Sequence, residues 1–171
     1  MDIFYDFDGT LFDTYPAMVN AFEQTASDYQ VEIDRTQAYQ QMRQGSLGVA
    51  IKALAEKLNL DRVEVEQHFR KIENEELKNS GPFEGVRDVL ELVVAHGGQN
   101  YLLTHRNQAA VTLLEKFQMK HLFQDFVTGD MIFPRKPNPA SLNYLIERNQ
   151  TNKKTAYMIG DRNLDIDAAH N

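Results

Sequence analysis

The apolar positions of this chain follow different spacings in different stretches, and these spacings indicate its elements. The apolar run Ile3-Phe4-Tyr5 ends in two carboxylates and a glycine, which is typical of a buried strand followed by a turn. From residue 14 to residue 80, apolar side chains recur every three to four positions, as they do in helices. After a break at residues 79–82, strand-like apolar runs alternate with helical patterns. These later runs are 100–104, 126–128 and 156–159.

The spacings predict an α/β fold with an inserted helical part. Alternating strands and helices favour right-handed crossovers, and so a Rossmann-like parallel sheet core with helices on both faces. We expect this core to comprise residues 1–13 and 81–171, and residues 14–80 to form an all-helical cap domain. Within the cap, the second of four predicted helices covers residues 34–43. The residues expected to cap the other three are Thr14, Ser46 and Asp61.

Composition and charge narrow the class of protein. The 171 residues are 42% hydrophobic and 25% charged, which is ordinary for a globular protein of this length. The formal net charge of -7, without any lysine or arginine cluster, argues against a nucleic-acid partner. The chain has no cysteine and no apolar run long enough to cross a membrane. We therefore expect a cytoplasmic protein, a monomer or a homodimer, with no membrane partner.

Two carboxylates follow the first predicted strand. Asp6 and Asp8 are two residues apart in extended chain, so their side chains project to the same side, and Gly9 lets the chain turn away. Two carboxylates held this close need a cation or a shared proton to offset their repulsion. The pattern indicates a magnesium site in which one carboxylate is a nucleophile and the other a general acid/base. The alternative is an ordinary polar turn.

Further polar side chains are expected at the same edge of the sheet. Thr104 ends the second strand and Asp161 the last, and open parallel sheets bind ligands beyond these carboxyl ends. Asp165 offers another oxygen ligand. The alternative is a structural role, since an acidic side chain in the first turn of a helix is stabilised by the helix dipole. Lys136 lies in a loop stiffened by prolines, where its charge can balance the carboxylates; a solvated surface lysine is the alternative.

Four motifs in this order resemble those of the haloacid dehalogenase-like hydrolase superfamily. They are Asp6-Phe7-Asp8-Gly9-Thr10, Thr104 after a strand, Lys136 in a Lys-Pro-x-Pro loop, and Gly160-Asp161 followed by Asp165. The resemblance covers essentially the whole chain. It is to the phosphoglycolate-phosphatase-like branch in particular, whose helical cap is inserted directly after the first motif. It implies a phosphatase that acts on a small phosphorylated metabolite with Mg²⁺ as its cofactor.

The same resemblance implies a role for each motif. Asp6 would be the nucleophile that forms an aspartyl-phosphate, and Asp8 would protonate the leaving oxygen and later activate water. Thr104 and Lys136 would bind the transferring phosphoryl group. The implied magnesium ligands are Asp6, the backbone carbonyl of Asp8, Asp161 and Asp165, the last directly or through water.

The resemblance also suggests where the substrate is read. The cap loop Arg43-Gln44-Gly45-Ser46-Leu47 resembles the substrate-specificity loop of the family. Arg43, Gln44 and Ser46 are therefore candidates for contacting the leaving group, and Thr10 of the first motif is a further candidate. The alternative for these cap residues is turn formation and helix capping, above all for Ser46.

Two features depart from the family pattern. His105 and Arg106 follow Thr104 where relatives commonly carry Asn-Lys; they either contact the substrate or lie on the surface, and we favour the surface. The chain also ends at Asn171, where relatives usually continue with another strand. We expect one sheet edge to be missing or supplied otherwise, with low stability or dimerisation as a consequence.

Three functions remain open at this point. Asp8 disfavours dehalogenase chemistry, since true dehalogenases of this fold lack that acid. The related phosphoglucomutases carry Glu-Asp where this chain has Gly160-Asp161, which favours a phosphatase. A phosphomutase is the second hypothesis, and a non-catalytic binding or regulatory member of the superfamily is the third.

Overall fold

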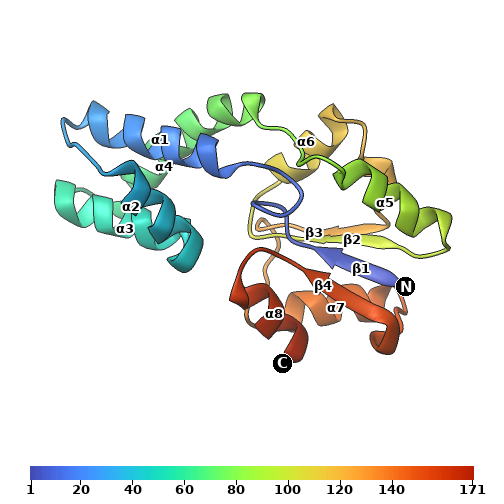
Figure 1. The fold of residues 1–171 in the computed structure, drawn as a ribbon. Coiled ribbons are helices and arrows are strands. Elements are labelled where there is room, and N and C mark those ends of the chain that lie inside the picture. The colour runs from blue at the N-terminus through green and yellow to red at the C-terminus, as the bar shows by residue number, and fades with distance from the viewer. The chain divides into compact units, whose positions relative to one another are not determined.

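The computed structural model describes all residues from 1 to 171, which form two compact units (Figure 1). One unit comprises Met1–Asp13 with Gly81–Asn171, and the other comprises Thr14–Ser80. The strands belong to the first unit and are β1 (Asp2–Tyr5), β2 (Asn100–Leu103), β3 (Asp125–Val127) and β4 (Ala156–Ile159). Its α-helices are α5 (Val86–Ala95), α6 (Ala109–Lys116), α7 (Ala140–Arg148) and α8 (Asn163–His170). The second unit contains α1 (Tyr15–Asp28), α2 (Arg35–Gln40), α3 (Leu47–Leu58) and α4 (Arg62–Glu76).

The four strands form one parallel sheet in the order β3-β2-β1-β4. β1 lies in the middle, so that Phe4 is opposite Tyr101 on one side and Met158 on the other. Helices α5 and α6 lie on one face of the sheet, and α7 and α8 lie on the other (Figure 1). Because both faces are covered, Ile3, Phe4 and Tyr5 are all buried, as the continuous apolar run indicated. The predicted Rossmann-like fold is confirmed.

The parallel arrangement sets the place of the polar side chains. Every strand runs in the same direction, so the four carboxyl ends meet along one edge of the sheet. The residues that come directly after the strands there are Asp6, Thr104, Thr128 and Gly160. This edge therefore carries the motifs on which the functional hypotheses depend.

β4 is an edge strand of the sheet. Ala156 and Met158 pack against the core cluster that contains Phe4, whereas Tyr157 and Ile159 are 56% and 41% exposed. Alternation of this kind is expected where one face of a strand is covered by a helix and the other is open. The sheet thus has an open side at β4, the strand that leads into the last motif.

The helical unit has a core of its own. Apolar side chains from all of its helices form one buried cluster, with Phe22, Ile51 and Phe69 among its members. Ser46 caps α3 by accepting a hydrogen bond from the Val49 amide at 3.2 Å, and Asp61 caps α4 in the same way. These two predicted helix starts are confirmed. Thr14 stands at the N-cap position of α1, but its side chain makes no capping hydrogen bond to that helix.

The helix predicted over residues 34–43 is shorter in the structure. α2 ends at Gln40, and a π-helical turn, η1 (Gln41–Gly45), follows it and continues through Gly45. Met42 stays buried in the core of the unit despite the wider turn. The apolar spacing could not reveal this change, because one inward side chain in a single turn fits either hydrogen-bonding pattern.

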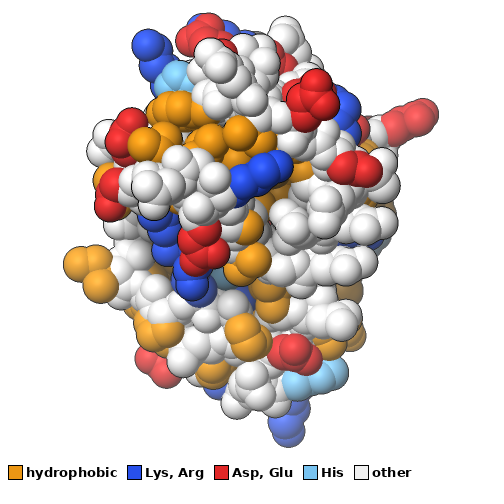
Figure 2. All heavy atoms as spheres, turned by 90° about the vertical axis from the view of Figure 1, so that its left-hand side faces the viewer, with side chains coloured by type: hydrophobic (Ala, Val, Ile, Leu, Met, Phe, Trp, Pro, Cys, Tyr) orange, Lys and Arg blue, Asp and Glu red, His pale blue; other side chains and the backbone are white.

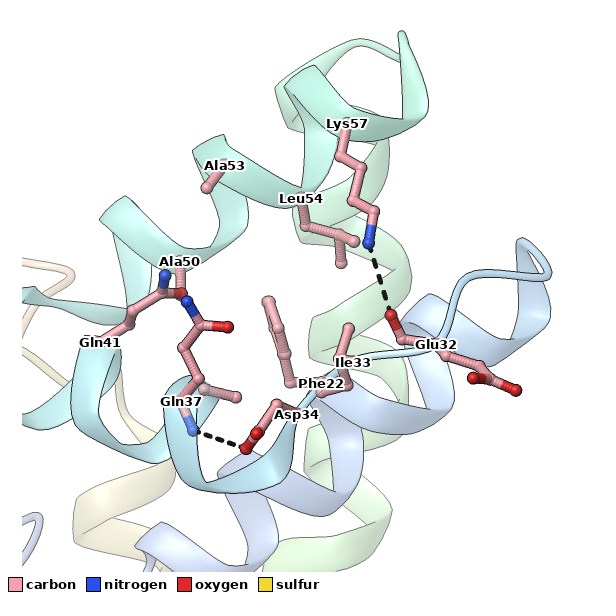
Figure 3. Close-up of a pocket in the computed structure, with 11 residues that line it drawn as sticks. Phe22, Glu32, Ile33, Asp34, Gln37, Gln41, Ala50, Ala53, Leu54 and Lys57 are labelled. Atoms are coloured by element: carbon pink, nitrogen blue, oxygen red, sulfur yellow. Dashed lines mark hydrogen bonds between the residues drawn. The ribbon is translucent and has the colours of Figure 1, made fainter.

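A cavity of about 190 Å³ lies among α1, α2 and α3 (Figure 3). Phe22 and Leu54 supply apolar walls, while Lys57 donates to the backbone carbonyl of Glu32 at 3.4 Å. The cavity contains none of the residues predicted to act in chemistry.

One face of the surface mixes charged and apolar side chains. On the face presented in Figure 2, acidic and basic side chains are interspersed among apolar and neutral ones. None of the helices combines the length and the apolar character that crossing a membrane would require.

Candidate active site

β1 leads directly into the two carboxylates of the first motif. Asp6 continues the strand through a hydrogen bond from its amide to the Ile159 carbonyl at 2.9 Å, and its side chain is 1% exposed. Phe7 is fully buried against Phe12, with 4.6 Å between ring centroids. Asp8 follows Phe7, and 18% of its side chain is exposed.

Lys136 is buried among these groups. Its ammonium donates to the carbonyl of Leu103 at 2.9 Å and to Oδ1 of Asp165 at 2.5 Å, and it lies 3.1 Å from Oδ1 of Asp6. The ammonium thus makes two hydrogen bonds and one further ion pair within the protein. Lys136 therefore balances and orients two carboxylates at the end of the sheet, and the solvated alternative is wrong.

Three carboxylates converge beside this lysine. One oxygen each from Asp6, Asp161 and Asp165 lies within 4.8 Å of the other two. Burial, followed by the negative charge of Asp6, raises the pKa of the Asp165 carboxyl, while Lys136 acts in the opposite direction. Oδ2 of Asp6 is buried without a hydrogen-bond partner, as is Oγ1 of Thr10 nearby in sequence. Clustered oxygen donors with a buried oxygen that lacks a hydrogen bond suit a hard divalent cation, so these residues fit Mg²⁺.

Arg106 corrects one of the sequence-based expectations. The residue is only 5% exposed, and its Nε donates to Oδ1 of Asp8 at 2.7 Å. Its amide donates to Oγ1 of Thr104 at 3.0 Å, which fixes the hydroxyl of a second motif residue. The favoured surface position is therefore wrong for Arg106. His105 is partly buried as well, and its Nε2 accepts a hydrogen bond from the Lys136 amide at 2.9 Å.

Arg162 is a charged neighbour that the sequence reasoning missed. Its Nη2 lies 3.5 Å from Oδ2 of Asp6, and its Nε lies 3.8 Å from Oδ1 of Asp161. The only signal in the sequence was its position directly after Asp161. Together with Lys136 and Arg106 it gives the cluster three cationic side chains against four carboxylates.

The remaining candidates belong to the helical unit. Arg43 and Gln44 are exposed in η1, and Arg43 contacts the hydroxyl of Tyr39 at 3.4 Å. Ser46 performs the capping role described above, which agrees with the alternative given for it. A part for these three residues in substrate recognition stays a prediction.

Gly160 leaves room for the side chain of Asp165, which belongs to the same motif. A Cβ atom at this position would lie 2.3 Å from Cγ of Asp165, which is fully buried. We expect Gly160→Ala to lower the free energy of unfolding by about 1–3 kcal/mol, because the carboxylate cannot move without strain. Chemical unfolding followed by circular dichroism measures the change. Gly81→Ala is the matched control, since its new Cβ meets Phe117 at an ordinary 3.6 Å; equal stability losses in the two variants would contradict the expected clash.

Comparison with known proteins supports the same site. The model of the haloacid dehalogenase-like hydrolase family matches residues 3–171. A phosphoglycolate phosphatase of Aliivibrio fischeri is 29% identical over 98% of this chain and 78% of its own length. A hydrolase structure from Streptococcus pneumoniae is 35% identical, with a TM-score of 0.69 over 99% of this chain and 87% of that one. The structure of a predicted phosphoglycolate phosphatase from Haemophilus somnus has a TM-score of 0.86 over 99% of this chain and 80% of that one; at 23% identity it supports the fold alone.

These similarities confirm the resemblance drawn from the four motifs, including its phosphoglycolate-phosphatase-like branch. The family model covers nearly the whole chain, from β1 to α8, and therefore spans all the residues of the carboxylate cluster. The protein belongs to the haloacid dehalogenase-like hydrolase family.

Proposed function

We propose that this protein is a cytoplasmic, magnesium-dependent phosphatase that hydrolyses a small phosphomonoester through an aspartyl-phosphate on Asp6. One observation carries the proposal: a buried lysine and three converging carboxylates lie at the carboxyl edge of the sheet. The names of relatives support phosphate-ester chemistry, and they make phosphoglycolate the first substrate to test.

The charge of the site explains why a cation is needed. A carboxylate that attacks a phosphate monoester is an anion approaching an anion, and repulsion must be offset before the two can meet. Lys136 is already engaged with Asp6 and Asp165, so its charge is largely balanced inside the protein. Asp6, Asp161 and Asp165 would hold Mg²⁺, with the backbone carbonyl of Asp8 as a further ligand. The ion supplies the positive charge that lowers this repulsion.

The residues can then divide the reaction into two steps. In the first, a carboxylate oxygen of Asp6 attacks phosphorus, the ester P–O bond breaks, and the leaving oxygen takes a proton from Asp8. In the second, a water molecule transfers a proton to Asp8 and attacks phosphorus. Phosphate is released and the Asp6 carboxylate is restored. Throughout, Arg106 would orient Asp8, and the Thr104 hydroxyl, which accepts from the Arg106 amide, would donate to a phosphoryl oxygen.

We further propose that the helical unit acts as a cap and reads the rest of the substrate through Arg43, Gln44 and Ser46. The π-helical turn η1 supports this assignment, because π-helical turns are frequent at functional sites. Thr10 is a candidate contact from the core, since its hydroxyl is buried without a hydrogen-bond partner.

The metal requirement gives the direct test. We expect phosphate release from p-nitrophenyl phosphate to require Mg²⁺, to stop with a chelator, and to return when Mg²⁺ is restored. Asp161→Asn should raise the Mg²⁺ concentration that gives half-maximal rate by about 10-fold or more, because one ligand loses its charge. Asp167→Asn is the matched control, since Asp167 is exposed in the same motif region.

Three results would contradict this proposal. Turnover that survives the chelator would remove the metal from the mechanism. An isomerised product without free phosphate, from a sugar phosphate substrate, would identify a phosphomutase instead. If a well-folded protein turns over none of a panel of phosphomonoesters that includes phosphoglycolate, the non-catalytic alternative becomes the better description.

A further inference from the structure

The loop that carries Lys136 has no regular secondary structure to hold it. This loop lies between β3 and α7. The ammonium of Lys136 must nevertheless contact three oxygens: one from Asp6 after β1, one from Leu103 at the end of β2, and one from Asp165 in α8. A long lysine side chain can reach a given point from many backbone positions. A group that fixes the backbone at Lys136 therefore reduces the freedom of the ammonium.

His105 supplies such a group. Its Nε2 accepts the hydrogen bond of the Lys136 amide at 2.9 Å. An amide N–H can only donate, so Nε2 must carry a lone pair, and in a neutral imidazole the proton then lies on Nδ1. Burial, followed by the positive charges of Lys136 and Arg135, lowers the pKa of His105 to about 3. The acceptor is therefore present over the whole neutral range of pH.

The backbone of His105 is itself held in place by its neighbours. A Cβ atom at Gly129 would lie 2.2 Å from the carbonyl oxygen of His105, so the two segments touch with no room to spare. The Gly129 amide donates to the Arg106 carbonyl at 2.7 Å, and the Arg106 side chain is bound to Asp8. The backbone of His105 is therefore held by its contact with Gly129 and by the hydrogen bond of the next residue, Arg106.

We propose that His105 is a positioning residue whose neutral imidazole holds the backbone of Lys136, so that the ammonium stays aligned with the nucleophile Asp6. The inference rests on the proposed phosphatase function and adds to it a residue that positions Lys136. His105 touches no reacting atom in this scheme. It acts through Lys136 alone.

Two substitutions separate the hydrogen bond from simple packing. Leucine fills similar space without an acceptor, whereas the side-chain oxygen of glutamine can take the place of Nε2. We expect His105→Leu to lower kcat by about 10–100-fold with little change in KM, because a displaced lysine misaligns Asp6. His105→Gln should restore most of the lost rate. His121→Leu, at an exposed histidine outside the site, is the control and should match the parent.

Two further measurements require no turnover. Nitrogen NMR of the parent should show the His105 imidazole with its proton on Nδ1 and no titration between about pH 5 and pH 8. Hydrogen exchange at the Lys136 amide should be slow in the parent and in His105→Gln, and faster in His105→Leu. The Thr104 amide, bonded to Val127 at 3.0 Å, serves as an internal control and should not change.

Several outcomes would overturn the proposal. They are a proton on Nε2, unchanged exchange at Lys136 in His105→Leu, or a glutamine variant no better than the leucine variant. If the parent shows no phosphatase activity, the proposed function fails, but the imidazole and amide measurements still decide whether His105 holds Lys136.

Discussion

Replacing Asp6 with asparagine is expected to lower kcat for phosphomonoester hydrolysis by at least about 10⁴-fold, since the variant lacks the attacking carboxylate. The amide has nearly the same shape and keeps one oxygen toward Lys136, which lies 3.1 Å from Oδ1 in the parent. The fold should therefore survive, and the loss should appear in kcat. Phosphate release at saturating Mg²⁺ measures it.

The control for this variant lies at the other end of β1. Asp2 stands at the amino end of β1, and its Oδ1 accepts a hydrogen bond from the Gln99 amide at 3.0 Å, which an asparagine oxygen can also accept. Asp2→Asn should keep the activity of the parent. Substantial turnover by a folded Asp6→Asn protein would show that the nucleophile is a different group.

The first motif shows why so much of the site was predictable. Strand alternation predicts that Asp6 and Asp8 share a side and that Phe7 points the other way, and the structure shows Phe7 buried against Phe12. The parallel sheet then brings the ends of β1, β2 and β4 to one edge, as the alternation of strands and helices indicated. Periodicity and topology therefore predicted which motifs would meet.

Arg106 shows where that reasoning stops. Its partner Asp8 is 98 residues away, and an arginine after a strand is equally compatible with solvent or with a buried ion pair. Only the folded structure shows that a carboxylate is available to balance its charge. Arg162 was missed for the same reason, since its nearest charges include Asp6 at the opposite end of the chain.

Replacing Lys136 with methionine is expected to produce the largest loss of stability among these variants. Methionine has a similar length and no charge, so Asp6 and Asp165 would remain buried without the cation that now lies 3.1 Å and 2.5 Å from them. Removing one partner of a buried ion pair typically costs about 3–5 kcal/mol of unfolding free energy. Urea unfolding without Mg²⁺, followed by circular dichroism, measures the difference from the parent.

The source of that loss can be separated from packing effects. Lys153→Met is the control, because Lys153 is exposed and its loss should change stability by no more than about 0.5 kcal/mol. Adding Asp165→Asn to Lys136→Met should recover part of the stability loss, since it removes one of the two buried carboxylate charges that Lys136 no longer balances. Mg²⁺ should also reduce the loss if it binds the same carboxylates, because it returns positive charge to them. A double variant less stable than Lys136→Met would mean that the ammonium does not offset the charge of Asp165, and the charge balance proposed for this site would be wrong.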